Sequence, residues 1–230
     1  MNPLLLPLVA AQGLWVRYRT EVLPEAAGPA NGTVGDGAHQ SLRVGVIGES
    51  TAAGCGVDRH EEGFAGSLAC ELAARNGQPV SWEVVGQNAA TARRIRYRLL
   101  PRLGQDLDIA VLLAGVNDVL TRRRPEEWRD DLAAIVGDLA GRAKKVAVTG
   151  IPPFNALPSL PGTLGRVLTR HAAVLDDVAR QVCVEYPQAT WISSTDIVPV
   201  GPEFFARDRF HPSVLGYRIW SQAVADRLVG

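Results

Sequence analysis

The chain has 230 residues, of which 47% are hydrophobic and 21% are charged. This length and composition fit one globular domain of ordinary size and exclude a disordered chain and a small disulfide scaffold. Lysine and arginine number 24, as do aspartate and glutamate, so the formal net charge is zero. A global basic field for binding nucleic acid is therefore absent. Cys55, Cys70 and Cys183 form no CxxC or Cys/His cluster, so neither a disulfide framework nor a zinc site is expected.

Residues 1–23 begin with a mostly apolar segment, 4–16. No basic residue precedes it, whereas Arg17 and Arg19 follow it, which reverses the charge order of a secretory signal. This reasoning favours a helix docked on the domain. A helix in the membrane interface, making weak contact through residues 4–19, and a cleaved signal stay open. We expect a cytoplasmic or peripherally membrane-associated protein rather than a secreted one, and no apolar run is long enough to span a bilayer.

Residues 24–40 contain four glycines, two prolines and few large apolar side chains. Such a composition predicts a linker or surface loop. The main domain is therefore expected over residues 41–230.

Apolar strand patterns and helical patterns alternate from residue 41 onward. The predicted strands cover 42–47, 80–85, 109–114, 146–149 and 189–193. The predicted helices cover 63–75, 92–103, 125–142 and 164–182, followed by a last helix capped by Ser213. This alternation is typical of βαβ units, so we predict an α/β fold: a three-layer αβα sandwich around a mainly parallel sheet of about five strands. Strand 80–85 alternates apolar and polar residues, which places it at an edge.

The residues whose side chains could take part in catalysis lie in loops at the ends of these elements. Ser50 follows the first strand, Asn117 and Asp118 follow the third, and Asp208 and His211 precede the last helix. Ligands bind beyond the carboxyl ends of the strands in such sheets. A serine hydroxyl needs an adjacent base, which a histidine supplies, and a carboxylate must orient that histidine.

The spacing of Asp208 and His211, three residues apart, places both side chains on the same side of one helical turn. The aspartate can then orient the imidazole locally. A tetrahedral acyl intermediate also needs preorganised donors for its oxyanion. The side-chain amide of Asn117 and the backbone N–H groups of Ser50 and 86–89 are the candidates.

Three blocks in this order resemble the SGNH hydrolases, also called GDSL hydrolases. Residues 48–54 (GESTAAG) are similar to the nucleophile block, with Glu49 in place of the usual aspartate. Residues 115–118 (GVND) match the G-x-N-D block, and residues 208–213 (DRFHPS) match the D-x-x-H-P block. The resemblance extends from Val44 to the last helix.

A fourth block fits this resemblance less closely. Residues 86–91 (GQNAAT) are similar to the family stretch G-x-S-G-x-T, which puts Ala89 where the family has its oxyanion glycine. The family uses the backbone N–H of that residue, which alanine also has. The replacement is harmless if φ is negative there and costly if φ is positive.

The resemblance implies a flavodoxin-like sandwich and a serine hydrolase of carboxylic esters, like an esterase, lipase or lysophospholipase. It implies Ser50, Asp208 and His211 as the catalytic triad, and Ser50, Ala89 and Asn117 as the oxyanion hole. It implies no cofactor or metal, and a small-molecule acyl ester or lipid as partner rather than nucleic acid. Apolar residues in loops 151–161 and 198–210 favour lipid or simple ester substrates over acetylated sugars.

Two other functions compete with this interpretation. An α/β-hydrolase predicts G-x-S-x-G, but Ala52 stands two residues after Ser50, and its acid and base lie far apart in sequence. A non-catalytic flavodoxin-like module could cradle a phosphate or flavin in loop 49–54, which leaves Asn117 and the Asp208–His211 pair unexplained. Asp118 is interpreted as a structural or helix-capping residue rather than the triad acid.

Overall fold

The computed structural model describes residues 6–36, 40–194 and 201–229. Its middle layer is a six-stranded sheet with the order β1-β3-β2-β4-β5-β6. The strands are β1 (Asn31–Val34), β2 (Leu42–Gly48), β3 (Val80–Gly86), β4 (Leu107–Leu113), β5 (Ala143–Thr149) and β6 (Ala189–Ile192). All neighbouring strands run parallel except β1, which pairs antiparallel with β3.

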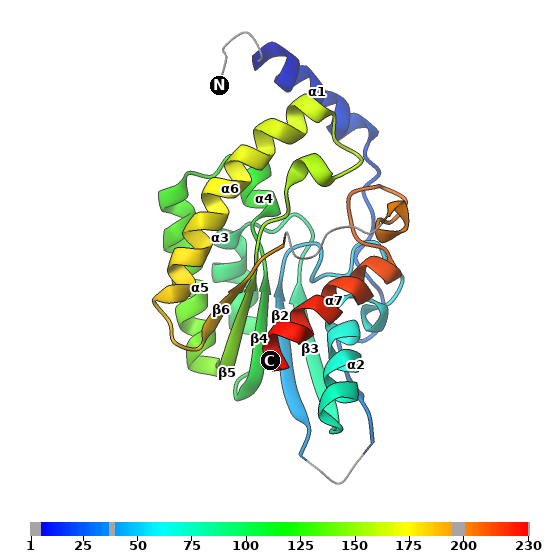
Figure 1. Ribbon diagram of the computed structural model, residues 1–230, viewed down its shortest axis with the longest axis vertical. Coiled ribbons are helices and arrows are strands. Elements are labelled where there is room, and N and C mark those ends of the chain that lie inside the picture. Colours follow the sequence, from blue (N-terminus) through cyan, green and yellow to red (C-terminus); the bar gives the residue numbers. More distant parts are fainter. Residues whose placement is uncertain (1–5, 37–39, 195–200, 230) are drawn as a thin grey trace.

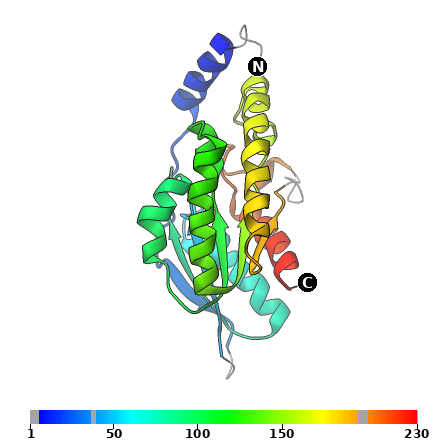
Figure 2. The same cartoon turned by 90° about the vertical axis from the view of Figure 1, so that its left-hand side faces the viewer.

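Helices cover both faces of this sheet (Figure 1, Figure 2). One face carries α2 (Phe64–Asn76) and α7 (Val214–Val229). The other carries the segment that begins with α3 (Ala92–Arg94), together with α5 (Pro125–Arg142) and α6 (Gly162–Val184). The remaining helical elements are α1 (Leu6–Arg19), α4 (Val116–Leu120) and the short 3-10 turns η2 (His60–Glu62), η5 (Phe154–Ala156) and η6 (Pro202–Phe204). The predicted three-layer αβα fold is confirmed, with six strands rather than five.

Two hydrophobic cores lie on either side of β2 and β4. Val46 and Val111 point into the core with α2 and α7, whereas Ile47 and Leu112 point into the core with α5 and α6. All four side chains are completely buried. Central parallel strands are covered on both faces, which explains why the sequence shows them as continuous apolar runs.

The segment predicted as a linker, 24–40, differs from that prediction. Its residues 31–34 form β1 and pair with β3, so β3 is not the edge strand that its alternating pattern suggested. Upstream of β1, Ala26 is buried and its N–H donates to the carbonyl of Ala53. The alternating sequence of β3 reflects the half-buried side chains on one of its faces. Such a pattern carries no information about whether another strand pairs with the backbone at its edge. Residues 37–39 of this segment lie outside the described residues.

The predicted helix 92–103 is interrupted. After α3 the chain makes a π-helical turn (Ile95–Leu99) and then a 3-10 turn (Leu100–Arg102) that contains Pro101. Proline has no N–H to continue a helical hydrogen-bond ladder. The cap predicted for the last helix is present, because the Ser213 hydroxyl accepts the N–H of Gly216 at 3.2 Å.

Candidate active site

Two loops bring Ser50 and His211 together at the carboxyl ends of the strands. The Oγ atom of Ser50 lies 2.9 Å from Nε2 of His211. The other ring nitrogen of His211, Nδ1, lies 2.6 Å from Oδ2 of Asp208. Ser50 and Asp208 are buried, and the His211 side chain is 13% exposed. The three side chains that the sequence singled out thus form one connected hydrogen-bonded chain.

Close backbone packing holds these two loops against each other. Gly56, six residues after Ser50, has φ of 105°, and a Cβ there would lie 2.3 Å from the carbonyl oxygen of Pro212. Only glycine allows this approach. The Tyr217 hydroxyl on α7 donates to the carbonyl of Cys55 at 2.7 Å, which fixes the loop of Ser50 to α7.

The carboxylate of Asp208 has a complete set of hydrogen-bond donors. Its Oδ1 atom accepts the backbone N–H groups of Phe210 and His211, each at 3.0 Å, and Oδ2 faces the imidazole. Burial opposes ionisation of Asp208, but the hydrogen bonds from His211 and Phe210 outweigh it and lower the pKa of this carboxyl. Asp208 is therefore an anion that fixes the orientation of the His211 ring.

Glu49 and Asn117 connect the loop of Ser50 to the loop after β4. Oε1 of Glu49 accepts the N–H of Val116 at 3.1 Å, and Oε2 accepts the N–H of Asn117 at 3.1 Å and its side-chain amide at 2.7 Å. The same amide nitrogen donates to the carbonyl of Ala90 at 3.2 Å. Burial raises the pKa of Glu49 to about 8. Sequence reasoning gave Glu49 no role, although its place beside Ser50 in the nucleophile block was a usable signal.

The loop that follows β3 runs alongside Ser50. The N–H of Gln87 donates to the carbonyl of Gly48 at 3.2 Å. Ala89 adopts φ of 56°, the left-handed conformation that is costly for a residue with a Cβ. Within the described part of the chain, the backbone N–H groups of Ser50 and Ala89 have no protein acceptor. Two backbone donors in these adjoining loops are thus available, but neither Ala89 nor Asn117 is among the residues that line the cavity beside Ser50 and His211.

Glu25 helps to hold this loop, and sequence reasoning missed it. Its Oε1 atom accepts the N–H of Asn88 at 2.6 Å, across 63 residues of chain. The residue lies in the segment predicted as a linker, where composition gives no signal of a specific contact.

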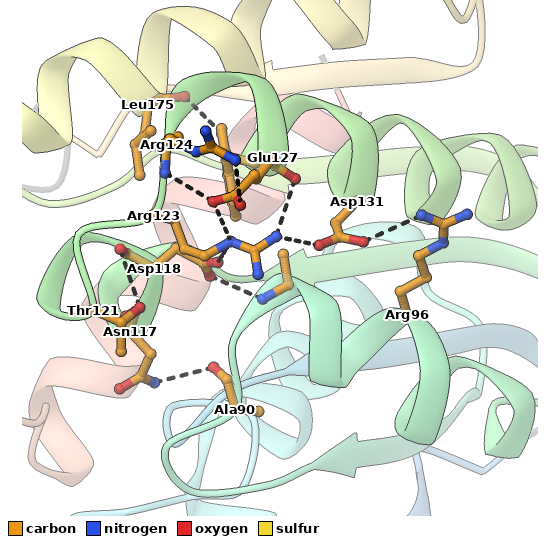
Figure 3. Close-up of polar contacts among 12 residues, drawn as sticks. Ala90, Arg96, Asn117, Asp118, Thr121, Arg123, Arg124, Glu127, Asp131 and Leu175 are labelled. Carbon is orange, nitrogen blue, oxygen red and sulfur yellow. Dashed lines mark hydrogen bonds and ion pairs between the residues drawn. The ribbon is translucent and has the colours of Figure 1, made fainter.

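Asp118, in contrast, is fully buried and belongs to an ion-pair network with Arg123 and Asp131 (Figure 3). Its Oδ2 accepts the N–H of Ala92 at the start of α3, at 2.9 Å. Arg123 lies between Asp118 and Asp131, and its Nη2 contacts Asp131 at 2.5 Å. Burial raises the pKa of Asp118 to about 6. These contacts support the structural, helix-capping interpretation of Asp118.

A cavity of about 310 Å³ opens beside Ser50 and His211. Its polar lining is Glu49, Ser50, Thr51, Thr149, Ser194 and His211. The rest of its described lining is apolar or glycine: Leu113, Ala114, Val116, Gly150, Pro152, Pro153, Ala156, Leu157, Phe204, Phe205, Phe210, Pro212 and Trp220. Such a cavity suits an apolar ligand with one polar reacting group. Positions 198–200 of the predicted flanking loop lie outside the described residues.

Cys55 lies close in the chain to Ser50, and its backbone N–H donates to the Ser50 carbonyl at 3.0 Å. Cys55 is fully buried, and burial raises the pKa of its thiol to about 12. Among the residues that the structure describes, no cluster of three or more His, Cys, Asp or Glu side chains could hold a metal ion.

Comparison with known families gives a direct assignment. A family model described as "GDSL-like Lipase/Acylhydrolase family" matches residues 46–219. The chain belongs to this family. The match includes Ser50 and His211, and it extends from within β2 to the first turns of α7. GDSL family members are esterases and acylhydrolases, which makes this chain an esterase- or lipase-like hydrolase by family.

Solved structures share the GDSL hydrolase fold at low sequence identity. A lipase/acylhydrolase from Enterococcus faecalis is 20% identical, with a TM-score of 0.61, over 81% of this chain and 95% of the other. An α/β hydrolase enzyme from the metagenome of Lake Arreo, Spain, is 20% identical, with a TM-score of 0.61, over 84% of this chain and all of the other. An acetylxylan esterase from Geobacillus stearothermophilus is 18% identical, with a TM-score of 0.57, over 81% of this chain and 94% of the other. No curated protein sequence matches the chain significantly.

Proposed function

We propose that this protein hydrolyses carboxylic esters of apolar acids through an acyl-enzyme on Ser50. The observation that carries the proposal is the hydrogen-bonded chain from the Ser50 hydroxyl through His211 to Asp208, with contacts of 2.9 Å and 2.6 Å. A serine, a histidine and a carboxylate in this order form a nucleophile, its base and the group that orients the base.

In the first half-reaction, Ser50 Oγ attacks the acyl carbon while His211 Nε2 takes the hydroxyl proton. Asp208 holds the proton of the neutral imidazole on Nδ1, so that Nε2 can accept the proton of Ser50. It then stabilises the imidazolium that forms. The bond to the leaving alcohol then breaks, and His211 gives its proton to that alcohol. In the second half-reaction, His211 takes a proton from water, the hydroxide attacks the acyl-enzyme, and the proton returns to Ser50 as the acid leaves.

The oxyanion of each tetrahedral intermediate needs donors that are already in place. The unpaired N–H groups of Ser50 and Ala89 fit this role. Both hydrogens of the Asn117 amide are already donated, to Glu49 and Ala90, so its contribution here is to hold the loop that carries Ala89. Loss of one such donor costs about 10²–10³ in kcat.

The lining of the cavity supports an apolar acyl chain as the group transferred. Pro152, Leu157, Phe205 and Phe210 give most of it an apolar surface, although polar side chains such as Thr149 and Ser194 also reach it. The described lining also has no lysine or arginine, which does not favour a phosphate or flavin. We therefore place simple or lipid acyl esters ahead of acetylated sugars.

A fluorophosphonate probe, followed by mass mapping of the tagged peptide, tests the nucleophile. We expect the label on Ser50 in folded protein and none in Ser50→Ala. The control is Ser159→Ala, in a loop outside the cavity lining, which should label like the parent. Labelling at another residue, or none in the parent, would end the proposal.

A panel of aryl esters of rising acyl length tests the substrate class. Ala156 is an exposed residue of the cavity lining, so Ala156→Phe should narrow the cavity without disturbing the core. We expect kcat/KM for octanoyl over butyryl esters to fall about tenfold or more in Ala156→Phe. Ala156→Ser, similar in size to the parent, should keep the parent ratio. Equal ratios in Ala156→Phe and Ala156→Ser would contradict the acyl assignment of this cavity.

A further inference from the structure

Helix α1 packs on the rest of the protein through only one of its faces. Val9 is 2% exposed, and Val16 packs against the same core. Between them, the Gln12 side chain accepts the N–H of Leu164, the third residue of α6, at 3.0 Å. The helix lies at one end of the molecule, beside the start of α6 (Figure 1, Figure 2).

The opposite face of α1 is also apolar, and no described part of the chain covers it. We call this surface the outer face of α1; it consists of Leu8, Ala11, Leu14, Trp15 and Tyr18. The spacing 8, 11, 15 and 18 places these residues along one side of a helix. Tyr18 is 93% exposed and Leu14 is 64% exposed. A helix that is apolar on all sides is normally buried on all sides.

This exposure is concentrated rather than scattered. Of the eleven large apolar side chains that are exposed in the described residues, five lie on α1 or just after it, within residues 8–22. Single exposed apolar residues need no explanation, but a contiguous patch marks a surface that meets something apolar.

The charge of α1 indicates what that surface meets. The helix has Arg17 and Arg19 in its last turn and no acidic residue. Arg19 lies over the Trp15 ring at 5.5 Å. The first acidic residue after the helix, Glu21, is already engaged by Arg207 at 3.0 Å. Tryptophan, tyrosine and arginine beside an apolar face are typical of helices that lie at the headgroup level of a bilayer.

We propose that the outer face of α1 binds the surface of a bilayer containing anionic phospholipid, with Arg17 and Arg19 near the lipid phosphates. The apolar side chains enter the boundary between headgroups and acyl chains, and the arginines attract the anionic headgroups. No described helix is long and apolar enough to cross the bilayer, so α1 lies on the surface. This binding does not depend on the proposed esterase function.

Contacts around α1 place the cavity near such a surface. In the first two turns of α6, Leu164 binds α1 through Gln12, and Thr169 binds the N–H of Asn155 in η5 at 3.0 Å. The two residues that follow Asn155, Ala156 and Leu157, line the cavity. The contact between α1 and α6 therefore lies about two turns of α6 from the cavity wall, and the thickness of α1, about 10 Å, separates that contact from a bilayer on the outer face.

Co-sedimentation with vesicles tests the binding, using the full chain with Ser50→Ala so that no lipid is consumed. The vesicles contain phosphatidylcholine alone or an equimolar mixture with phosphatidylglycerol. We expect binding to the mixed vesicles that weakens with salt. Trp15→Ser with Tyr18→Ser should weaken it about tenfold or more. Val184→Ser, which removes an 83% exposed side chain at the far end of α6, should change nothing.

A second set of variants tests the charge contribution. Arg17→Gln with Arg19→Gln should weaken binding to the mixed vesicles about tenfold and reduce its salt dependence. Arg43→Gln, an exposed arginine at the start of β2, is the matched control and should bind like the parent. Brominated lipids should quench the fluorescence of the parent more than that of Trp15→Phe, which reports insertion of that side chain directly.

Three results would overturn the proposal. The first is equal sedimentation of the parent and Trp15→Ser/Tyr18→Ser with matching thermal melting curves. The second is equal affinity for neutral and mixed vesicles. The third is self-association, measured by light scattering, that Trp15→Ser/Tyr18→Ser abolishes while vesicles bind nothing, because the outer face would then meet a second copy of the chain.

Discussion

The side-chain amide of Asn117 donates to the buried carboxyl of Glu49 at 2.7 Å. The contact connects the residue before Ser50 to the loop after β4, and the same carboxyl accepts two backbone N–H groups of that loop. Because Asn117 also donates to the carbonyl of Ala90, Glu49 indirectly positions the loop that carries Ala89. Glu49 is therefore a positioning residue.

Glu49→Ala should lower both activity and stability. An alanine removes the acceptor of the Val116 and Asn117 donors and leaves buried donors unpaired, each at a cost of about 1–3 kcal/mol. We expect kcat to fall about tenfold or more and Tm to fall, measured with an aryl ester and by calorimetry. Glu83→Ala is the control, because Glu83 in β3 accepts a backbone N–H as well, that of Gly104 at 2.8 Å, but does not line the cavity. It should affect Tm alone, and an equal loss of kcat in both variants would contradict the role of Glu49.

The raised pKa of Glu49 predicts a pH dependence of stability. The pKa of this carboxyl is 4.5 in the unfolded chain and about 8 in the folded protein. Between these values the native state holds a proton that the unfolded state has released, so the contribution of Glu49 is complete below pH 4.5 and lost as the pH rises through 8. We expect Tm to fall from pH 6.5 to pH 9, a range that lies above the Asp118 pKa of about 6. Glu49→Gln should flatten this slope, and an unchanged slope would show that other groups cause it.

Asp208→Asn should keep the fold but remove most of the activity. The asparagine oxygen can replace Oδ1, which accepts the N–H groups of Phe210 and His211. Its NH₂ group then faces Nδ1 of His211 and makes that nitrogen an acceptor. The ring proton moves to Nε2, which can no longer accept the proton of Ser50. We expect kcat to fall by about 10³–10⁴ while Tm stays close to the parent. A fall of less than tenfold would show that Asp208 does not set the tautomer.

Ala89→Gly should stabilise the protein and keep its activity. Ala89 adopts φ of 56°, which costs an alanine about 1–2 kcal/mol that a glycine avoids, less the greater freedom of glycine in the unfolded chain. We expect a small rise in Tm and a kcat/KM that stays the same or increases. Ala90→Gly is the control, since Ala90 is buried and has no positive φ, so this change should lower Tm. A large loss of kcat in Ala89→Gly would mean that Ala89 is not at the oxyanion position.

The sequence alone determined the layered fold and pointed to Ser50, Asp208 and His211, which the structure brings into contact. Buried parallel strands require apolar side chains on both faces, so β2 and β4 were visible as continuous runs, and their ends located the loops of Ser50 and Asn117. The three-residue spacing of Asp208 and His211 is a local property, which explains why their pairing could be predicted without coordinates.

Only the tertiary structure decided the contacts between segments that are far apart in the chain. Strand β1 is short and half-exposed, and its pairing with β3 depends on backbone hydrogen bonds that leave no apolar pattern in the sequence. The bond between Glu25 and Asn88 and the three bonds to Glu49 join loops across more than 60 residues, and no local periodicity encodes them. The φ of Ala89 is likewise imposed by its surroundings, because an isolated alanine avoids that conformation.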